Sequence, residues 1–127
     1  LASAGHDPPL RLRGGARREW LPVQPGPALG FEEHADYPEW RGTLGPGDAI
    51  VAFTDGVTEA SDRAGVMFGT DRIEATLHEA GDGTAHGLAG SLQVAVRRFE
   101  ADAPPSDDLT VLVLRYQPEA KDHAAAA

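Results

Sequence analysis

Residues 49–60 read AIVAFTDGVTEA, and this stretch decides the fold prediction. Its first five residues form a nearly continuous apolar run, which is typical of a strand buried on both faces of a sheet. A Gly-Pro-Gly-Asp turn signal at residues 45–48 comes before the run, and Thr54-Asp55-Gly56 comes directly after it. The stretch therefore predicts a core strand over residues 49–53 that ends in a loop carrying a carboxylate.

Shorter strands are expected upstream of this core strand. Leu10 and Leu12 alternate with arginines, which is the period-two pattern of a half-buried strand. The glycine pair at residues 14–15 predicts a turn, so the strands on either side of it should form a β-hairpin. The expected upstream strands cover residues 1–4, 10–13, 19–23 and, more weakly, 37–44.

Two helices and a final strand are expected downstream. Thr70 is the predicted N-cap of a first helix that ends at Gly81, and a second helix begins near Thr84. Residues 109–116 are apolar and β-branched enough to form a last strand. The order of strands, two helices and a strand predicts an α+β fold. The apolar faces of the two helices contain Ile73, Leu77 and Ala80, and Leu88, Leu92, Val96 and Phe99.

Composition excludes several classes of protein. The 127 residues suit one domain or a piece of one, and the absence of cysteine excludes disulfides, thiolate zinc sites and a cysteine nucleophile. The net charge of −9 makes nucleic acid and anionic membranes poor partners, and no apolar run is long enough to span a bilayer. Four arginines between residues 11 and 18 are interpreted as a solvated hairpin rather than an anion site.

Two acidic segments are candidates for chemistry, because each places carboxylates where a loop meets a predicted strand. Asp55 follows the core strand, and Asp107 and Asp108 precede the last one. Carboxylates without nearby histidine or cysteine suit hard cations such as Mg²⁺, Mn²⁺ or Ca²⁺. Ordinary turn chemistry also explains the same residues, and from the pattern alone we favour it, with metal binding as the alternative. The spacing of an EF-hand calcium loop does not occur in the chain.

Six short motifs in a fixed order resemble the metal-dependent protein phosphatases of type 2C, the PPM class. Within that class they are similar to the bacterial stage II sporulation protein E branch. The motifs are ASAGHDPPL at residues 2–10, PALG at 27–30, LGPGD at 44–48, FTDGVTEA at 53–60, FGTDRI at 68–73 and DDLTVLVL at 107–114.

The resemblance implies a fold and a reaction. The expected fold is the C-terminal portion of a four-layer αββα sandwich, with antiparallel sheets and two flanking helices. The expected activity is hydrolysis of phosphoserine or phosphothreonine on a protein by a water that two Mn²⁺ or Mg²⁺ ions activate. The substrate class implied by this branch is an anti-anti-sigma-type regulator in bacterial signalling, and the expected location is the cytoplasm.

The resemblance also implies roles for individual residues. Asp55 and Asp107 match the family's metal-ligating aspartates, while no side chain serves as a covalent nucleophile. Gly56 and Asp108 match supporting positions. His6 could contact phosphate or donate a proton, but we favour a loop histidine bonded to backbone.

Other family ligands would lie upstream, which predicts an incomplete site. Residues 1–117 are expected to be the C-terminal half of a phosphatase domain, and residues 118–127 a tail or linker remnant. The chain begins at Leu1 and its single methionine is Met67, so we expect it to derive from a longer protein. The expected partners are a phosphoprotein substrate and the missing N-terminal half, with a second copy of the chain as a further candidate. The alternative is a non-catalytic half-domain that serves as an interaction or dimerisation module.

Overall fold

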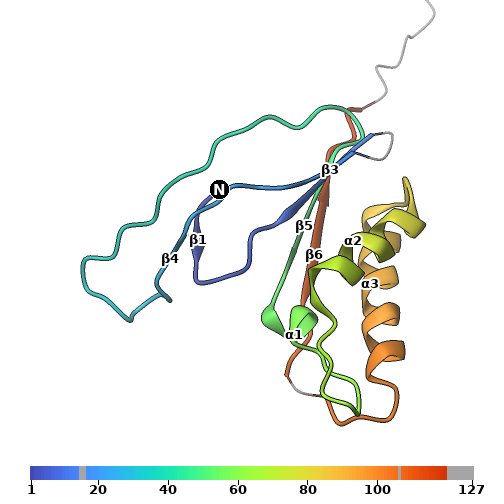
Figure 1. Ribbon diagram of the computed structural model, residues 1–127. Coiled ribbons are helices and arrows are strands. Elements are labelled where there is room, and N and C mark those ends of the chain that lie inside the picture. Colours follow the sequence, from blue (N-terminus) through green and yellow to red (C-terminus); the bar gives the residue numbers. More distant parts are fainter. Residues whose placement is uncertain (15–16, 106, 120–127) are drawn as a thin grey trace, which may run out of the picture.

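The fold is built on a four-stranded antiparallel sheet with two helices along one face (Figure 1). The computed structural model describes residues 1–14, 17–105 and 107–119, so most of the predicted tail lies outside the described residues. The sheet order is β3-β2-β5-β6, and the helices connect β5 to β6 in sequence. The α+β prediction is therefore confirmed. The sheet contains β2 (Leu10–Arg13), β3 (Arg17–Trp20), β5 (Ala49–Phe53) and β6 (Val111–Arg115).

A second, smaller pair of strands lies apart from the helices (Figure 1). β1 (Ser3–Ala4) pairs in parallel with β4 (Pro25–Gly26), where the sequence predicted only the first of these strands. The strand predicted over residues 37–44 is wrong, because that segment has no strand in the structure. Its backbone instead exchanges two hydrogen bonds with Leu1: Trp40 N donates to the Leu1 carbonyl at 2.7 Å, and the Leu1 amine donates to the Trp40 carbonyl at 2.8 Å.

The predicted β-hairpin is present, but one of its arginines is not solvated as expected. Arg11 is buried and its Nη2 donates to Asp48 Oδ2 at 2.7 Å. This hydrogen bond, together with N–H groups of Gly45 and Gly14 that also point at the carboxylate, holds the pKa of Asp48 below its usual value. The pair ties β2 to the turn that precedes β5.

The helices pack on the sheet through the faces that the periodicity predicted. α2 (Gly69–Ala80) ends at Gly81, whose φ is +60°, and α3 (Ala85–Glu100) is capped by the Thr84 hydroxyl, which accepts from Gly87 N at 3.0 Å. The predicted N-cap at Thr70 is wrong, because α2 begins one residue before it. The buried core formed by the sheet and the helices includes Leu10, Val51, Phe53, Ile73, Leu77, Leu88, Leu92 and Val96.

The opposite face of the sheet is open over the described part of the chain. β5 was predicted to be buried on both faces, but Ile50 and Ala52 are only partly buried. On β6, Val111 and Val113 pack against the core, whereas Leu112 and Leu114 are 58% and 52% exposed. We define the open face as Ile50, Ala52, Leu112 and Leu114, which form two cross-strand pairs.

No described helix is both long and apolar enough to cross a membrane.

Candidate metal centre

Asp55 lies at the end of β5, where the chain turns into a short helix that the sequence analysis did not predict. This helix, α1 (Asp55–Thr58), starts with the aspartate in its first turn. A carboxylate there is favoured by the unpaired N–H groups and the dipole of the helix start. The Asp55 side chain is exposed, while Gly56 and Val57 beneath it are buried. The Asp55 carboxylate is thus accessible, while the two residues that follow it are buried.

The segment that carries Asp107 and Asp108 lies against α1. The Thr54 amide donates to the Thr110 carbonyl at 3.1 Å, and the Thr54 hydroxyl donates to the Asp108 carbonyl at 3.1 Å. Gly56 packs so closely that a Cβ there would lie 2.3 Å from the Asp108 carbonyl oxygen. The metal-ligand roles that the resemblance implies for Asp55 and Asp107 would require these two distant acidic segments to meet, and the structure brings their backbones into contact.

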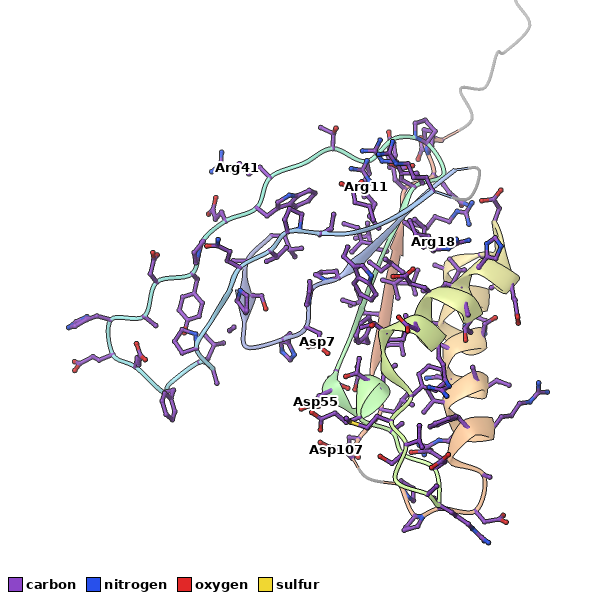
Figure 2. The ribbon with its side chains drawn as sticks, viewed as in Figure 1. Asp7, Arg11, Arg18, Arg41, Asp55 and Asp107 are labelled. Carbon is purple, nitrogen blue, oxygen red and sulfur yellow. The ribbon has the colours of Figure 1, made fainter. Side chains whose placement is uncertain are left out.

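The carboxylates of Asp55 and Asp107 lie at the same end of the sheet (Figure 2). Asp107 is exposed, and its Oδ1 accepts the Asp108 N–H at 2.7 Å. That bond fixes the side chain in a turn and leaves its other oxygen available to a ligand. Asp108 is also exposed, and its backbone carbonyl is the part that contacts α1. Ser106, which precedes this pair in the sequence motif, lies outside the described residues.

Asp7 is a third carboxylate beside this site, and the sequence analysis assigned it no role. Its Oδ2 accepts a hydrogen bond from the Thr58 hydroxyl at 3.0 Å, which joins the loop after β1 to α1. Asp7 and Asp55 both line an open hollow of about 620 Å³, together with Trp20 and Met67. Sequence position gave no signal for Asp7, because it lies about fifty residues from α1 and meets it only through the fold.

His6 lies in a different position from the other candidates. It lines a hollow of about 420 Å³ over the open face, with Ala52, Thr54 and Leu112, and it does not line the hollow that contains Asp55. Its backbone N–H and carbonyl both bond to the Ser3 hydroxyl at 3.2 Å. The expected hydrogen bond from the His6 ring to backbone is not found among the described residues, where Ser3 instead supplies the loop contact.

The oxygen donors suit a hard cation, but they form only part of a centre. Carboxylate oxygens are the ligands that Mg²⁺ and Mn²⁺ prefer. Among the described residues, no group of three or more aspartate, glutamate, histidine or cysteine side chains is close enough to hold a metal ion. Asp55 and Asp107 could therefore contribute to a site, and the described part of the chain does not complete it.

Comparison of the sequence with models of known protein families identifies the family of the chain. The family model described as stage II sporulation protein E matches residues 1–117. The chain belongs to this family. Phosphoserine phosphatase RsbU of Bacillus subtilis is 29% identical over 114 residues, which cover 90% of this chain and 33% of that protein. The chain thus spans about a third of the length of this relative.

Solved phosphatase domains share the fold. The PP2C domain of SiaA from Pseudomonas aeruginosa matches with a TM-score of 0.68 and 21% identity, covering 87% of this chain and 43% of that one. The phosphatase domain of the family's namesake, the cell fate determinant of Bacillus subtilis, matches with a TM-score of 0.67 and 19% identity, covering 92% and 50%. Its crystals were presoaked with Mn. These likenesses confirm a PP2C-type fold of which this family member spans a part.

Proposed function

We propose that this family member is part of a metal-dependent protein phosphatase that hydrolyses phosphoserine or phosphothreonine on a protein. The observation that carries the proposal is the contact between two separate carboxylate segments at one end of the sheet, through Thr54 and Gly56. Two bound Mn²⁺ or Mg²⁺ ions would lower the pKa of a water molecule and neutralise charge on the phosphoryl oxygens.

We assign each residue a role according to its position in the structure. Asp55 and Asp107 are the proposed metal ligands, because both side chains are exposed at the same end of the sheet. Gly56 allows the close approach of the two segments, and Asp108 receives the Thr54 hydroxyl bond that holds them. His6 is at most a supporting residue, since it lies on the neighbouring hollow.

The remaining ligands are proposed to come from an N-terminal half of the domain. An Mg²⁺ or Mn²⁺ ion prefers about six oxygen ligands, and two-metal chemistry needs groups that hold both ions about 4 Å apart. The described residues provide no three-ligand group, and the matched solved domain is about twice as long as the aligned region. The 127-residue chain alone should therefore be inactive.

The open face supports the same arrangement. Leu112 and Leu114 on β6, with Ile50 and Ala52 opposite them, offer a row of apolar side chains that a second sheet could cover. We propose that residues 1–117 are the C-terminal half of the domain and that the N-terminal half packs here. The alternative is that a second copy of the chain covers this face.

The proposed substrate is a phosphorylated anti-anti-sigma-type regulator, and the proposed location is the cytoplasm. A matched relative is named a phosphoserine phosphatase, and one solved neighbour from Mycobacterium tuberculosis contains RsbU and RsbW domains in one structure. A chain with net charge −9 and no cysteine is compatible with that setting. The competing proposal is a non-catalytic half-domain that serves as an interaction module, which the open face would also fit.

The test uses the complete domain and the isolated chain in a phosphate-release assay with and without Mn²⁺. Asp55→Asn and Asp107→Asn should each lower the rate of the complete domain by at least about 100-fold, because each removes a charged ligand at nearly constant volume. Asp82→Asn is the matched control, since Asp82 is an exposed carboxylate beyond the C-terminus of α2 and should leave the rate unchanged.

Three results would contradict the proposal. Full activity of Asp55→Asn in the complete domain would show that Asp55 is not a ligand. Mn²⁺-dependent turnover by the 127-residue chain would show that no upstream ligands are needed. A complete domain that lacks any turnover on phosphoserine peptides, yet binds a partner through the open face, would favour the interaction module.

A further inference from the structure

Thr54 occupies the N-cap position of α1 but does not cap it. Threonine at this position ordinarily accepts a hydrogen bond from an N–H of the first helical turn. The backbone of Thr54 has the expected extended conformation, with φ −86° and ψ 164°, yet its side chain makes no capping bond. The hydroxyl is turned away from the helix that follows it and is used elsewhere.

The Thr54 hydroxyl instead joins the two carboxylate segments. Its Oγ1 donates to the Asp108 carbonyl at 3.1 Å and accepts the Thr110 N–H at 3.1 Å. The Thr54 amide adds a third bond, to the Thr110 carbonyl at 3.1 Å. A single side chain therefore fixes the backbone on both sides of Leu109. Since Asp55 is the next residue along one segment and Asp107 lies next to Asp108, the same bonds set where both carboxylates stand.

Only a hydroxyl can make both side-chain bonds, because the group must donate and accept at once. Serine keeps this capacity, whereas valine has nearly the shape of threonine and lacks it. With valine, one carbonyl and one N–H lose their partner, and the end of β6 is free to move away from α1. Displacement of a reacting group by about 1 Å can lower a rate by about 100-fold.

We infer that Thr54 is a positioning residue of the metal centre, and that its hydroxyl holds the Asp55 and Asp107 carboxylates in register for a divalent cation. The inference rests on the proposed function for the identity of the ligand. It adds a role that lies outside the ligand set itself, in a side chain that would touch neither metal nor substrate.

The experiment compares Thr54→Val with Thr54→Ser, using Thr76→Val as the control. Thr76 lies on α2, and its hydroxyl has no hydrogen-bond partner within the described residues, so the same swap there should change nothing. Calorimetric titration of the complete domain with Mn²⁺ should show binding weakened about 10- to 100-fold by valine and restored by serine. In the 127-residue chain, hydrogen exchange at the Thr110 N–H should become about five- to tenfold faster with valine only.

The outcomes separate this inference from the proposed function. If the wild-type domain binds Mn²⁺ and the valine variant binds it equally well, the positioning role is overturned and the phosphatase proposal still stands. Wild-type domain that binds no Mn²⁺ would overturn both. Loss of Mn²⁺ affinity in valine and serine variants alike would also contradict the inference, because the hydroxyl that serine retains would then not be sufficient to hold the site.

Discussion

Replacing Gly56 with alanine tests whether the two carboxylate segments must touch. The added Cβ would lie 2.3 Å from the Asp108 carbonyl oxygen and 2.9 Å from its carbonyl carbon, whereas ordinary contacts begin near 3.4 Å. The segments must therefore separate by roughly 1 Å. Gly56 lies within α1, in a conformation that alanine adopts readily, so the clash alone determines the outcome. Overpacking of this kind costs about 1–3 kcal/mol of folding stability.

Two measurements follow from that displacement. Urea unfolding of the 127-residue chain should show the loss of stability, and Mn²⁺-dependent phosphate release by the complete domain should fall about 100-fold. Gly90→Ala is the control, because Gly90 lies within α3 and nothing stands within 4 Å of a Cβ there. That change should stabilise the chain by about 0.5–1 kcal/mol. A Gly56→Ala domain as stable and as active as wild type would refute the claim that the contact sets the site.

Three further predictions concern the scaffold. Asp48→Asn should destabilise the chain by about 3–5 kcal/mol at pH 7, because it leaves buried Arg11 unpaired. Folding lowers the pKa of Asp48, so the difference in unfolding free energy between variant and wild type, measured with urea, should be largest above the unfolded pKa of about 3.9. The difference should shrink as the pH falls below that value. Replacing exposed Leu112 and Leu114 with threonine should change unfolding stability by no more than about 0.5 kcal/mol while reducing any self-association seen by sedimentation velocity. Thr84→Ala should cost about 1 kcal/mol in thermal unfolding through loss of the α3 cap, and an unchanged midpoint would contradict that role.

The helical part of the fold could be predicted because its signals are local. The helix start near Thr84 and the stop at Gly81 each depend on a few neighbouring residues, and both were predicted correctly. The start of α2 was misplaced by two residues, since the N-cap is Phe68, which makes no side-chain bond, and not Thr70. The strand predicted over residues 37–44 failed because the segment does not join a strand ladder, and the backbone of Trp40 instead makes a single pair of bonds with Leu1.

The strand β5 shows what an apolar pattern can and cannot indicate. A run of five apolar residues predicts burial on both faces, yet Ile50 and Ala52 are only partly buried. The pattern reports how apolar the two faces are, and it does not say what covers them. Arg11 is the opposite case, because it belongs to a group of four arginines on a hairpin that were expected to be solvated, while its actual partner, Asp48, lies 37 residues away.

The candidate site was predicted in part, for a physical reason. Asp55 and Asp107 stand out because each adjoins a predicted strand, and resemblance to a family gave them a shared role that stays a prediction. Their spatial approach depends on the register of β5 with β6, which pairs Phe53 with Val111. The role proposed for Thr54 depends on the same pairing, whereas the contact of Asp7 with Thr58 depends on the pairing of β2 with β5, and no local pattern reveals either.

The pairing of β5 with β6 also has a consequence for how the chain folds. The two strands are separated in sequence by both α2 and α3, so this pairing closes the longest loop between neighbours in the sheet. Contacts of such high sequence separation form slowly and late, because their loop-closure entropy must be overcome first. The end of the sheet that carries Asp55 and Asp107, where we propose that a cation binds, would then be assembled in the last stage of folding. An unfolded or half-translated chain could not bind the ion, so a bound ion would indicate that folding is complete.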